Sequence, residues 1–198
     1  PITKKSGLFF LGPLGQIRPE VIRHRTRLWE RYSPPREGEI LVLLSQTQMK
    51  PFHKSKEHQK IMTEIEQKLG RRMCNVHVCT YAAPFGLIPT ELDEVYPLSQ
   101  CEIVTPLDLE TTNYTAQQIM KYIMTTNYKR VILVWDTNLW RRSIVTACKR
   151  ACKNRNMPLT ILKLKTSLDA KALEDLATSM ESGDVNLNSV TLKINENK

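Results

Sequence analysis

The sequence lacks several patterns that would assign it to a common class of protein. No apolar run approaches the roughly 20 residues that a membrane-spanning helix needs, so we expect no membrane segment. The short apolar patch near the start is interrupted by glycine and proline too early for a signal peptide. The chain has only seven glycines, with neither a GxGxxG pattern nor a P-loop. We therefore expect no cofactor of the dinucleotide or nucleoside triphosphate type, and no other cofactor is indicated.

Cysteine is present, but not in the arrangements that bind metals. The five cysteines form no Cys-x-x-Cys pair, and no cysteine and histidine cluster has the spacing of a structural zinc site. Cys74, His77 and Cys79 are close together, but valines alternate with them as in a strand. A metal site there is the weaker alternative, and we predict none. The cysteines are expected to be reduced thiols in a cytoplasmic protein.

Acidic residues are fewer than basic ones. The chain has 29 lysines and arginines against 20 acids, a net charge of +9. The last 33 residues carry three lysines and six acids, so residues 1–165 carry +12. A basic body of this size favours a polyanion partner, most commonly nucleic acid. A solvated basic surface without a partner is the alternative.

The hydrophobic pattern predicts strands that alternate with helices. Apolar runs at residues 40–44 and 130–135 have the length and branching of buried strands. Further strands are predicted at 75–80, 101–104 and 159–164, and helices at 19–32, 58–70, 90–95, 115–125, 139–153 and 169–180. Residues 81–89, with two prolines, are predicted to be a loop. This order predicts an α/β fold with a central, mostly parallel sheet flanked by helices.

Three parts of the chain are distinguished on this basis. Residues 1–17 are expected to form an N-terminal arm, and residues 18–165 an α/β domain of a catalytic type. Residues 166–198 are expected to form a C-terminal helix and a polar tail, with a weak strand at 190–194 as an option.

Polar side chains follow the first predicted strand closely. Lys50, Ser55 and two histidines lie within the nine residues from Lys50 to His58. In open α/β sheets, ligands bind in the crevice beyond the carboxyl ends of the strands. A functional site is therefore predicted at this segment.

The spacing of these residues resembles a specific family motif. That motif reads Pro-Cys, three residues, Lys-Pro-Tyr, two residues, Ser, two residues, His. Two flanking segments, residues 18–35 and 85–97, also resemble the family, and the resemblance runs from about residue 18 to residue 165. On these segments the chain resembles the archaeosine synthase catalytic-domain family, which is related to archaeal tRNA-guanine transglycosylases. The matching motif positions are Ser45-Gln46, Lys50-Pro51-Phe52, Ser55 and His58.

The resemblance implies a fold and an activity. The fold would be like that of uracil-DNA glycosylases, a three-layer sandwich with a ligand cleft at the strand ends. The activity would be tRNA modification, in which a lysine amine adds to the nitrile of 7-cyano-7-deazaguanine in tRNA. Full-length members carry additional RNA-binding domains. We therefore expect tRNA as a partner, together with a possible partner protein that supplies such domains or further catalytic groups.

The resemblance and the charge pattern together suggest roles for individual residues. As catalytic residues we predict Lys50 as a positive charge, Ser55 as a hydrogen-bonding group and His58 as a proton carrier. As substrate-binding residues we predict Gln46, Pro51, Phe52, His53, Glu91, Tyr96 and Asp136. As nucleic-acid-binding residues we predict Arg23, Arg27, Arg31, Lys54 and Lys56.

The chain departs from the family motif at a chemically important place. Ser45-Gln46 replaces Pro-Cys, so the thiol is missing where the motif has one, and an amide cannot replace a thiolate. Cys79 is a weaker candidate for a relocated thiol. A non-catalytic tRNA- or partner-binding module of the same fold is therefore the alternative. A glycosylase-like hydrolase is a third, weaker hypothesis. Individual residues have structural alternatives too: Ser55 as a helix cap, His58 as a structural helix residue and Asp136 as a cap for the segment from Asn138 onward.

Overall fold

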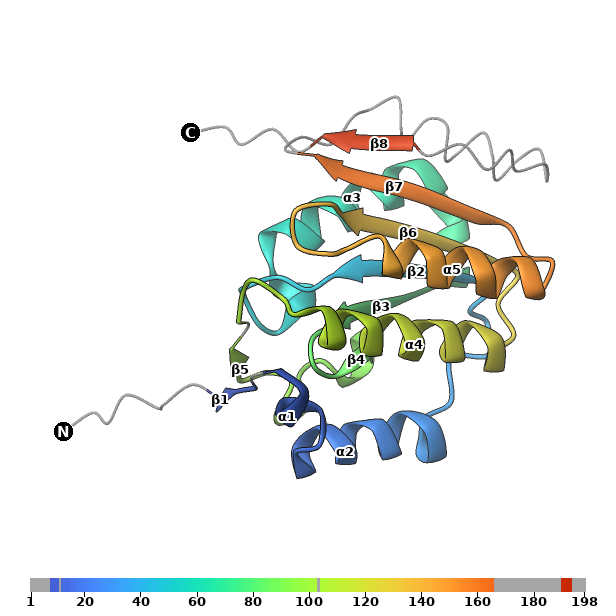
Figure 1. Cartoon of the computed structure of the whole chain (residues 1–198). Coiled ribbons are helices and arrows are strands. Elements are labelled where there is room, and N and C mark those ends of the chain that lie inside the picture. Colours follow the sequence, from blue (N-terminus) through green and yellow to red (C-terminus); the bar gives the residue numbers. More distant parts are fainter. Residues whose placement is uncertain (1–7, 11, 103, 166–189, 194–198) are drawn as a thin grey trace, which may run out of the picture.

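A six-stranded, mostly parallel sheet lies at the centre of the molecule, in the strand order β4-β3-β2-β6-β7-β8 (Figure 1). The structure is a computed structural model, and it describes residues 8–10, 12–102, 104–165 and 190–193. The strands of the sheet are β2 (Ile40–Ser45), β3 (Val76–Ala82), β4 (Gly86–Pro89), β6 (Arg130–Asp136), β7 (Leu159–Lys165) and β8 (Val190–Lys193). All neighbours pair in parallel except β3 and β4, which are antiparallel. The predicted α/β fold with a mostly parallel sheet is therefore confirmed.

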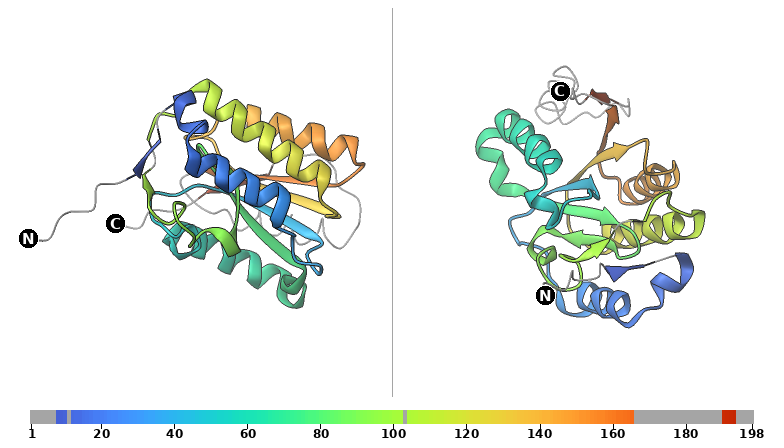
Figure 2. Two further views of the ribbon diagram at one scale, coloured as in Figure 1. Left: turned by 90° about the horizontal axis from the view of Figure 1, so that it is seen from below. Right: turned by 90° about the vertical axis from the view of Figure 1, so that its left-hand side faces the viewer.

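Helices cover both faces of this sheet (Figure 2). On one face lie α4 (Leu109–Thr125) and α5 (Ser143–Asn154), next to α2 (Pro19–Thr26) and the π-helical turn at Arg27–Arg31 that extends it. On the other face lies α3 (Lys56–Leu69). A short helix, α1 (Gly12–Gln16), and a two-stranded parallel pair, β1 (Leu8–Phe9) and β5 (Cys101–Glu102), lie outside the main sheet. Three 3-10 segments complete the described secondary structure: Phe52–Lys54, Gly70–Asn75 and Thr90–Leu92.

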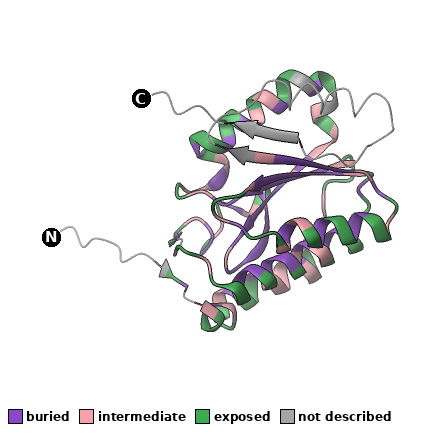
Figure 3. Cartoon of the chain, turned by 45° about the horizontal axis from the view of Figure 1, so that its top comes forward, coloured by how far each residue is buried: buried purple, intermediate pink, exposed green. Residues whose placement is uncertain are grey.

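The core explains why the central strands are continuously apolar. Leu41 and Leu43 of β2 pack toward α4 and α5, whereas Val42 and Leu44 pack toward α3. All four are fully buried, and Figure 3 shows the strands as the buried interior between partly exposed helices. A parallel strand with helices on both faces has no solvent side, so alternation between apolar and polar residues is lost.

A smaller apolar cluster lies beside the main core. It contains Phe52 from the loop after β2, Phe85 and Ile88 from the region of β4, and Leu98. Val21 of α2 packs into the same cluster. This cluster joins the loop that follows β2 to the segment that follows β3, which positions the candidate site.

Part of the segment after β3 differs from the prediction. Residues 81–89, predicted as a loop, contain the end of β3 and the antiparallel edge strand β4. Gly86 has φ +84°, and a Cβ built on it would lie 2.7 Å from Cγ of Gln118 on α4. Only glycine fits this close approach, so here glycine marks a tight hairpin rather than an irregular loop.

Two further elements are corrected by the structure. The helix predicted at 90–95 is a 3-10 turn at Thr90–Leu92, and the strand predicted at 101–104 is β5, which pairs with β1 instead of joining the main sheet. The weak strand predicted at 190–194 is present as β8, which pairs with β7. The helix predicted at 169–180 lies outside the described residues. Within the described chain, no helix has the length and apolar character needed to cross a bilayer.

Candidate functional site

The motif loop, residues 45–58, begins at the carboxyl end of β2 and is held there by buried hydrogen bonds. Trp140 donates its indole N–H to Ser45 Oγ over 3.0 Å. The backbone carbonyl of Ser45 accepts a hydrogen bond from His58 Nε2 at 2.7 Å. Ser45, His58 and Trp140 are all buried. The two ends of the loop are therefore fixed to each other and to the segment after β6.

Gln46 occupies the position of the motif cysteine and makes structural contacts there. Its backbone N–H donates to the carbonyl of Tyr81, and its side-chain Oε1 accepts from the N–H of Ala83 at 2.8 Å. The residue is only 3% exposed. Gln46 thus links the end of β2 to the end of β3, and its buried Nε2 amino group has no hydrogen-bond partner among the described residues.

Ser55 and His58 stabilise the start of α3. Ser55 Oγ accepts a hydrogen bond from the N–H of His58 at 3.1 Å, as an N-cap residue does. Burial lowers the pKa of His58, although the Ser45 carbonyl opposes this effect. The imidazole is therefore neutral at pH 7, with its proton on Nε2. Both side chains hold the motif loop in shape.

Lys50, Pro51 and Phe52 lie at the turn before the helix. Phe52 is 1% exposed and belongs to the smaller apolar cluster. The Nζ atom of Lys50 lies 5.5 Å from the centre of the Phe52 ring, a cation–π distance. Lys50 and Pro51 are half-buried, so the Lys50 ammonium stays at the surface of this cluster.

His53 and Lys54 join the motif loop to the second signature, residues 85–97. The Nδ1 atom of His53 lies 2.8 Å from Oδ1 of Asp93, and the His53 backbone N–H donates to Oδ2 of the same carboxylate at 3.0 Å. Asp93 is 1% exposed, whereas the His53 side chain is 37% exposed. Lys54 pairs with Glu94 at 2.6 Å. A buried carboxylate therefore orients an accessible imidazole, which is the arrangement of a positioned general base.

A second histidine–carboxylate pair lies close by. His77 Nε2 lies 3.3 Å from Oε2 of Glu91, and the hydroxyl of Tyr32 donates to the same oxygen at 3.3 Å. The Nδ1 atom of His77 pairs with the hydroxyl of Tyr128, which lies 3.2 Å from the hydroxyl of Tyr122. Burial acts to raise the pKa of Glu91, but hydrogen bonds from His77, the backbone and Tyr32 outweigh it and leave the pKa lowered. Glu91 is therefore an anion that accepts two hydrogen bonds.

Cys79 lies behind this network and is not accessible. Its Sγ atom is 3.8 Å from Nε2 of His77, but the residue is fully buried. Burial raises the pKa of its thiol well above the usual value, and the Glu91 charge acts in the same direction. A protonated, buried thiol is a poor nucleophile, so this geometry does not favour Cys79 as a relocated catalytic cysteine.

Two cavities lie near these residues. The edge cavity, about 470 Å³, runs along the edge of β3 beyond the end of β4. The rim cavity, about 490 Å³, lies beyond the carboxyl end of β6 and is lined by residues 105–107 and 137–141. The edge cavity is lined by Pro35, His53, Val76, His77, Val78, Thr90, Glu91 and Glu94. The edge cavity thus brings together His53 and Glu91, two predicted substrate-binding residues, with the unpredicted His77.

The remaining predicted residues lie elsewhere. Asp136 follows β6, and its Oδ1 accepts from the backbone N–H groups of Asn138 and Leu139 at 2.9 and 3.2 Å, as the capping alternative requires. Tyr96 is exposed, in the second signature. The predicted nucleic-acid-binding residues fall into two groups on opposite faces of the sheet: Arg23, Arg27 and Arg31 on α2 and its extension, and Lys54 and Lys56 at the start of α3. No group of three or more His, Cys, Asp or Glu side chains among the described residues is placed to hold a metal ion.

Comparison with known proteins identifies the family. A family model described as a domain of unknown function, DUF5591, matches residues 21–180. The chain belongs to the DUF5591 family. Among curated relatives, this DUF5591 chain is 31% identical over 123 residues to a tRNA-guanine(15) transglycosylase of Methanococcus vannielii. It is 33% identical over 91 residues to the archaeosine synthase subunit alpha of Thermococcus kodakarensis. The chain is thus a member of an archaeosine synthase-related family.

The matches cover only part of these relatives. They span 62% and 46% of the DUF5591 chain, but only 16% of each of the two relatives. Among solved structures, the crystal structure of AF0587, a protein of unknown function, matches with a TM-score of 0.51 and 14% identity. That match covers 87% of this chain and 53% of the other. It shows a shared α/β fold.

Sequence reasoning missed two residues of the candidate site, Asp93 and His77. Asp93 lies in the second signature, and its role as partner of His53 follows only from folding, because 40 positions separate the two. The sequence offers His77 only as a weak metal-ligand candidate, and its alternation with valines indicates an ordinary strand residue. The available signal was the acidic pair Asp93-Glu94 within the second signature.

Proposed function

We propose that this DUF5591 domain acts in tRNA modification of the archaeosine-synthase type, with tRNA as its partner. Three facts support the proposal: the family match, the names of its relatives and the charge of +12 on residues 1–165. The geometric observation that carries it is the contact between the two signature segments. There the buried Asp93 orients His53 at a cavity of about 470 Å³.

The proposed reaction is the addition of a lysine amine to the nitrile of 7-cyano-7-deazaguanine in tRNA. The amine lone pair forms a bond to the nitrile carbon, and the carbon–nitrogen triple bond becomes a double bond. One proton moves from the amine nitrogen to the former nitrile nitrogen, and no group leaves. The chemistry therefore needs a base that can accept a proton and return it nearby.

His53 is suited to that proton transfer. The Asp93 carboxylate accepts the Nδ1 N–H of His53, which leaves Nε2, 3.6 Å from Oε1 of Glu94, as the ring nitrogen proposed to exchange the proton. Within the predicted catalytic set, Lys50 supplies positive charge next to Phe52, and Ser55 and His58 keep the loop in shape. Because Gln46 replaces the motif cysteine, the amine attacks the nitrile directly, without a covalent thioimidate.

A non-catalytic tRNA-binding module is the second candidate. The observation that favours it is the absence of an accessible thiol at the motif. Gln46 makes packing hydrogen bonds in the cysteine position, and Cys79 is fully buried with a raised pKa. In this role the domain would hold tRNA for a partner protein that carries the reacting groups.

Mass spectrometry of tRNA nucleosides tests both candidates. The protein is incubated with lysine and with tRNA that contains 7-cyano-7-deazaguanine. A nucleoside heavier by one lysine is expected from the enzyme, and it should disappear with His53→Asn but persist with Lys60→Gln, an exposed control position on α3. An unchanged nucleoside, in a sample that still binds tRNA, would refute the enzymatic role and support the binding module. A sample that does not bind tRNA even at low salt would refute both.

A further inference from the structure

The segment from residue 137 to residue 165 carries charge of only one sign. It contains no aspartate or glutamate. By contrast, α3 on the other face of the sheet carries three lysines and three glutamates. The surplus positive charge of the domain is therefore unevenly placed. The basic residues of the segment are Arg141, Arg142, Lys149, Arg150, Lys153, Arg155, Lys163 and Lys165.

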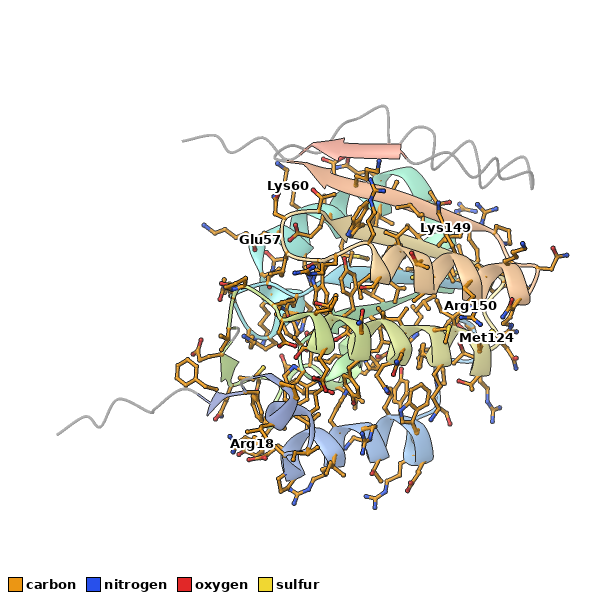
Figure 4. All side chains as sticks on the ribbon, viewed as in Figure 1. Arg18, Glu57, Lys60, Met124, Lys149 and Arg150 are labelled. Atoms are coloured by element: carbon orange, nitrogen blue, oxygen red, sulfur yellow. The ribbon has the colours of Figure 1, made fainter. Side chains whose placement is uncertain are left out.

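Five of these residues are exposed and lie on α5 or directly before it, and we call them the α5 basic face: Arg141, Arg142, Lys149, Arg150 and Lys153. Arg142, Lys149 and Lys153 are seven and four residues apart, a spacing that places them along one side of a helix. The side chains from Arg142 to Lys153 span about 16 Å at 1.5 Å per residue. Figure 4 shows Lys149 and Arg150 on α5, away from the Glu57 and Lys60 side chains of α3.

These five side chains are available for a partner. All five are exposed, and none has an ion-pair partner within the described part of the chain. Lys54, by contrast, is already paired with Glu94, and Lys56 precedes Glu57 at the start of α3. Binding of phosphates to the α5 basic face would therefore displace only solvent and counterions.

The chemistry of α5 favours an RNA backbone over a lipid surface. The apolar side of the helix is buried in the core through Ile144, Cys148 and Cys152, so it has no apolar face for insertion into a membrane. Its exposed side is basic and polar. Such a surface attracts a phosphate backbone through charge alone, without base contacts.

The α5 basic face also leads to the rim cavity. Arg141 and Trp140 line this cavity of about 490 Å³ at the carboxyl end of β6. Trp140 in turn donates to Ser45 at the start of the motif loop. An RNA strand that follows α5 toward its amino end therefore arrives at the rim of the sheet, where the motif loop begins.

We infer that the α5 basic face is the principal tRNA-binding surface of this domain. The arginines of residues 18–31 share their segment with Glu20 and Glu30, and Lys54 before α3 is paired with Glu94, whereas no acid lies within residues 137–165. The inference rests on the proposed function in that tRNA is taken as the partner. It assigns the contact to phosphates of structured RNA, and it places the RNA on the face of the sheet that α4 and α5 cover.

Three charge-matched double variants test this assignment. Lys149→Gln/Lys153→Gln changes α5, Arg23→Gln/Arg27→Gln changes α2 and the π-helical turn that extends it, and Lys56→Gln/Lys60→Gln changes α3. Each pair is four residues apart on a helix, and each lowers the net charge by two. Binding of tRNA is measured by filter retention or anisotropy at several salt concentrations, with circular dichroism as the control for folding.

The α5 variant is expected to weaken tRNA binding about tenfold or more at about 0.1 M salt. It should also reduce the slope of log affinity against log salt by about two, since two phosphate contacts are lost. The α2 and α3 variants should change affinity less than threefold. An α2 or α3 variant that weakens binding as much as the α5 variant would overturn the inference, while tRNA binding by the unchanged protein would leave the proposed function standing.

If the unchanged protein itself fails to bind tRNA, the result has a different meaning from weakened binding in a variant. If it does not bind tRNA at low salt, the proposed function and the inference both fail. If it binds vesicles of anionic phosphatidylserine but not tRNA, the α5 basic face serves a membrane surface, and the RNA assignment is overturned.

Discussion

The pH dependence of stability should reveal the buried histidine of α2. His24 is 2% exposed, its Nε2 donates to the carbonyl of Leu87 at 2.8 Å, and its ring packs edge-on against Phe85. Burial lowers the pKa of His24 to about 4 from an ordinary value of 6.5; the Leu87 carbonyl opposes this effect, and the charge of Arg27 adds to it. His24 therefore anchors α2 to β4 as a neutral imidazole.

The sign of the effect follows from proton uptake. Because the folded-state pKa of His24 is lower than the unfolded value, the unfolded chain takes up the proton first as pH falls. The contribution of neutral His24 to the free energy of unfolding is complete above pH 6.5. It decreases as pH falls, and the loss is complete below about pH 4. At roughly 1.4 kcal/mol per pH unit, the loss is about 2 kcal/mol at pH 5 and about 3 kcal/mol in full.

Urea unfolding at pH 7.5 and pH 5.0 measures this loss. The variant His24→Gln keeps a donor for the Leu87 carbonyl but does not titrate, so it should lose about 2 kcal/mol less than the unchanged protein between the two pH values. His58, whose pKa burial also lowers, is present in both proteins, so its effect cancels in the difference. Equal losses in the two proteins would refute the assignment of a depressed pKa to His24.

Three further predictions concern the motif loop and the thiols. Ser55→Ala removes the cap on the N–H of His58 and should cost about 1 kcal/mol, measured by thermal unfolding, whereas Ser55→Thr should restore most of it. Phe52→Ala should cost about 3–5 kcal/mol in urea unfolding because the side chain fills the smaller apolar cluster, and a Phe52→Ala protein as stable as the unchanged one would contradict that packing. A thiol reagent should label Cys74 rapidly and Cys79 only after unfolding; equal rates in the native protein would show that Cys79 is accessible.

The hydrophobic pattern of the sequence was sufficient to predict the central strands of the sheet. The strands β2 and β6 appear in the sequence as continuous apolar runs because helices cover them on both faces. Such a run can be recognised from the order of the residues alone. The segment around β4 was not predictable in this way. Its strand has only four residues, and its formation depends on pairing with β3 and on the fit of Gly86 against α4.

The candidate site, too, could be predicted only in part from the sequence. The motif spacing was enough to select Ser55, His53 and His58 as residues of interest, but not to distinguish their roles. Ser55 and His58 bond to the backbone of their own loop, and these contacts are local. The partner of His53 is Asp93, which no local pattern relates to it.

By itself, the sequence determined the α/β class, the family resemblance and the excess of positive charge, because these follow from hydrophobic periodicity, motif spacing and composition. The tertiary structure decided which polar groups meet. It brought His53 to Asp93 and His77 to Glu91, buried the Cys79 thiol and left the basic side chains of α5 exposed. Such contacts depend on how distant segments pack, and packing is a property of the whole chain that no single segment of the sequence contains.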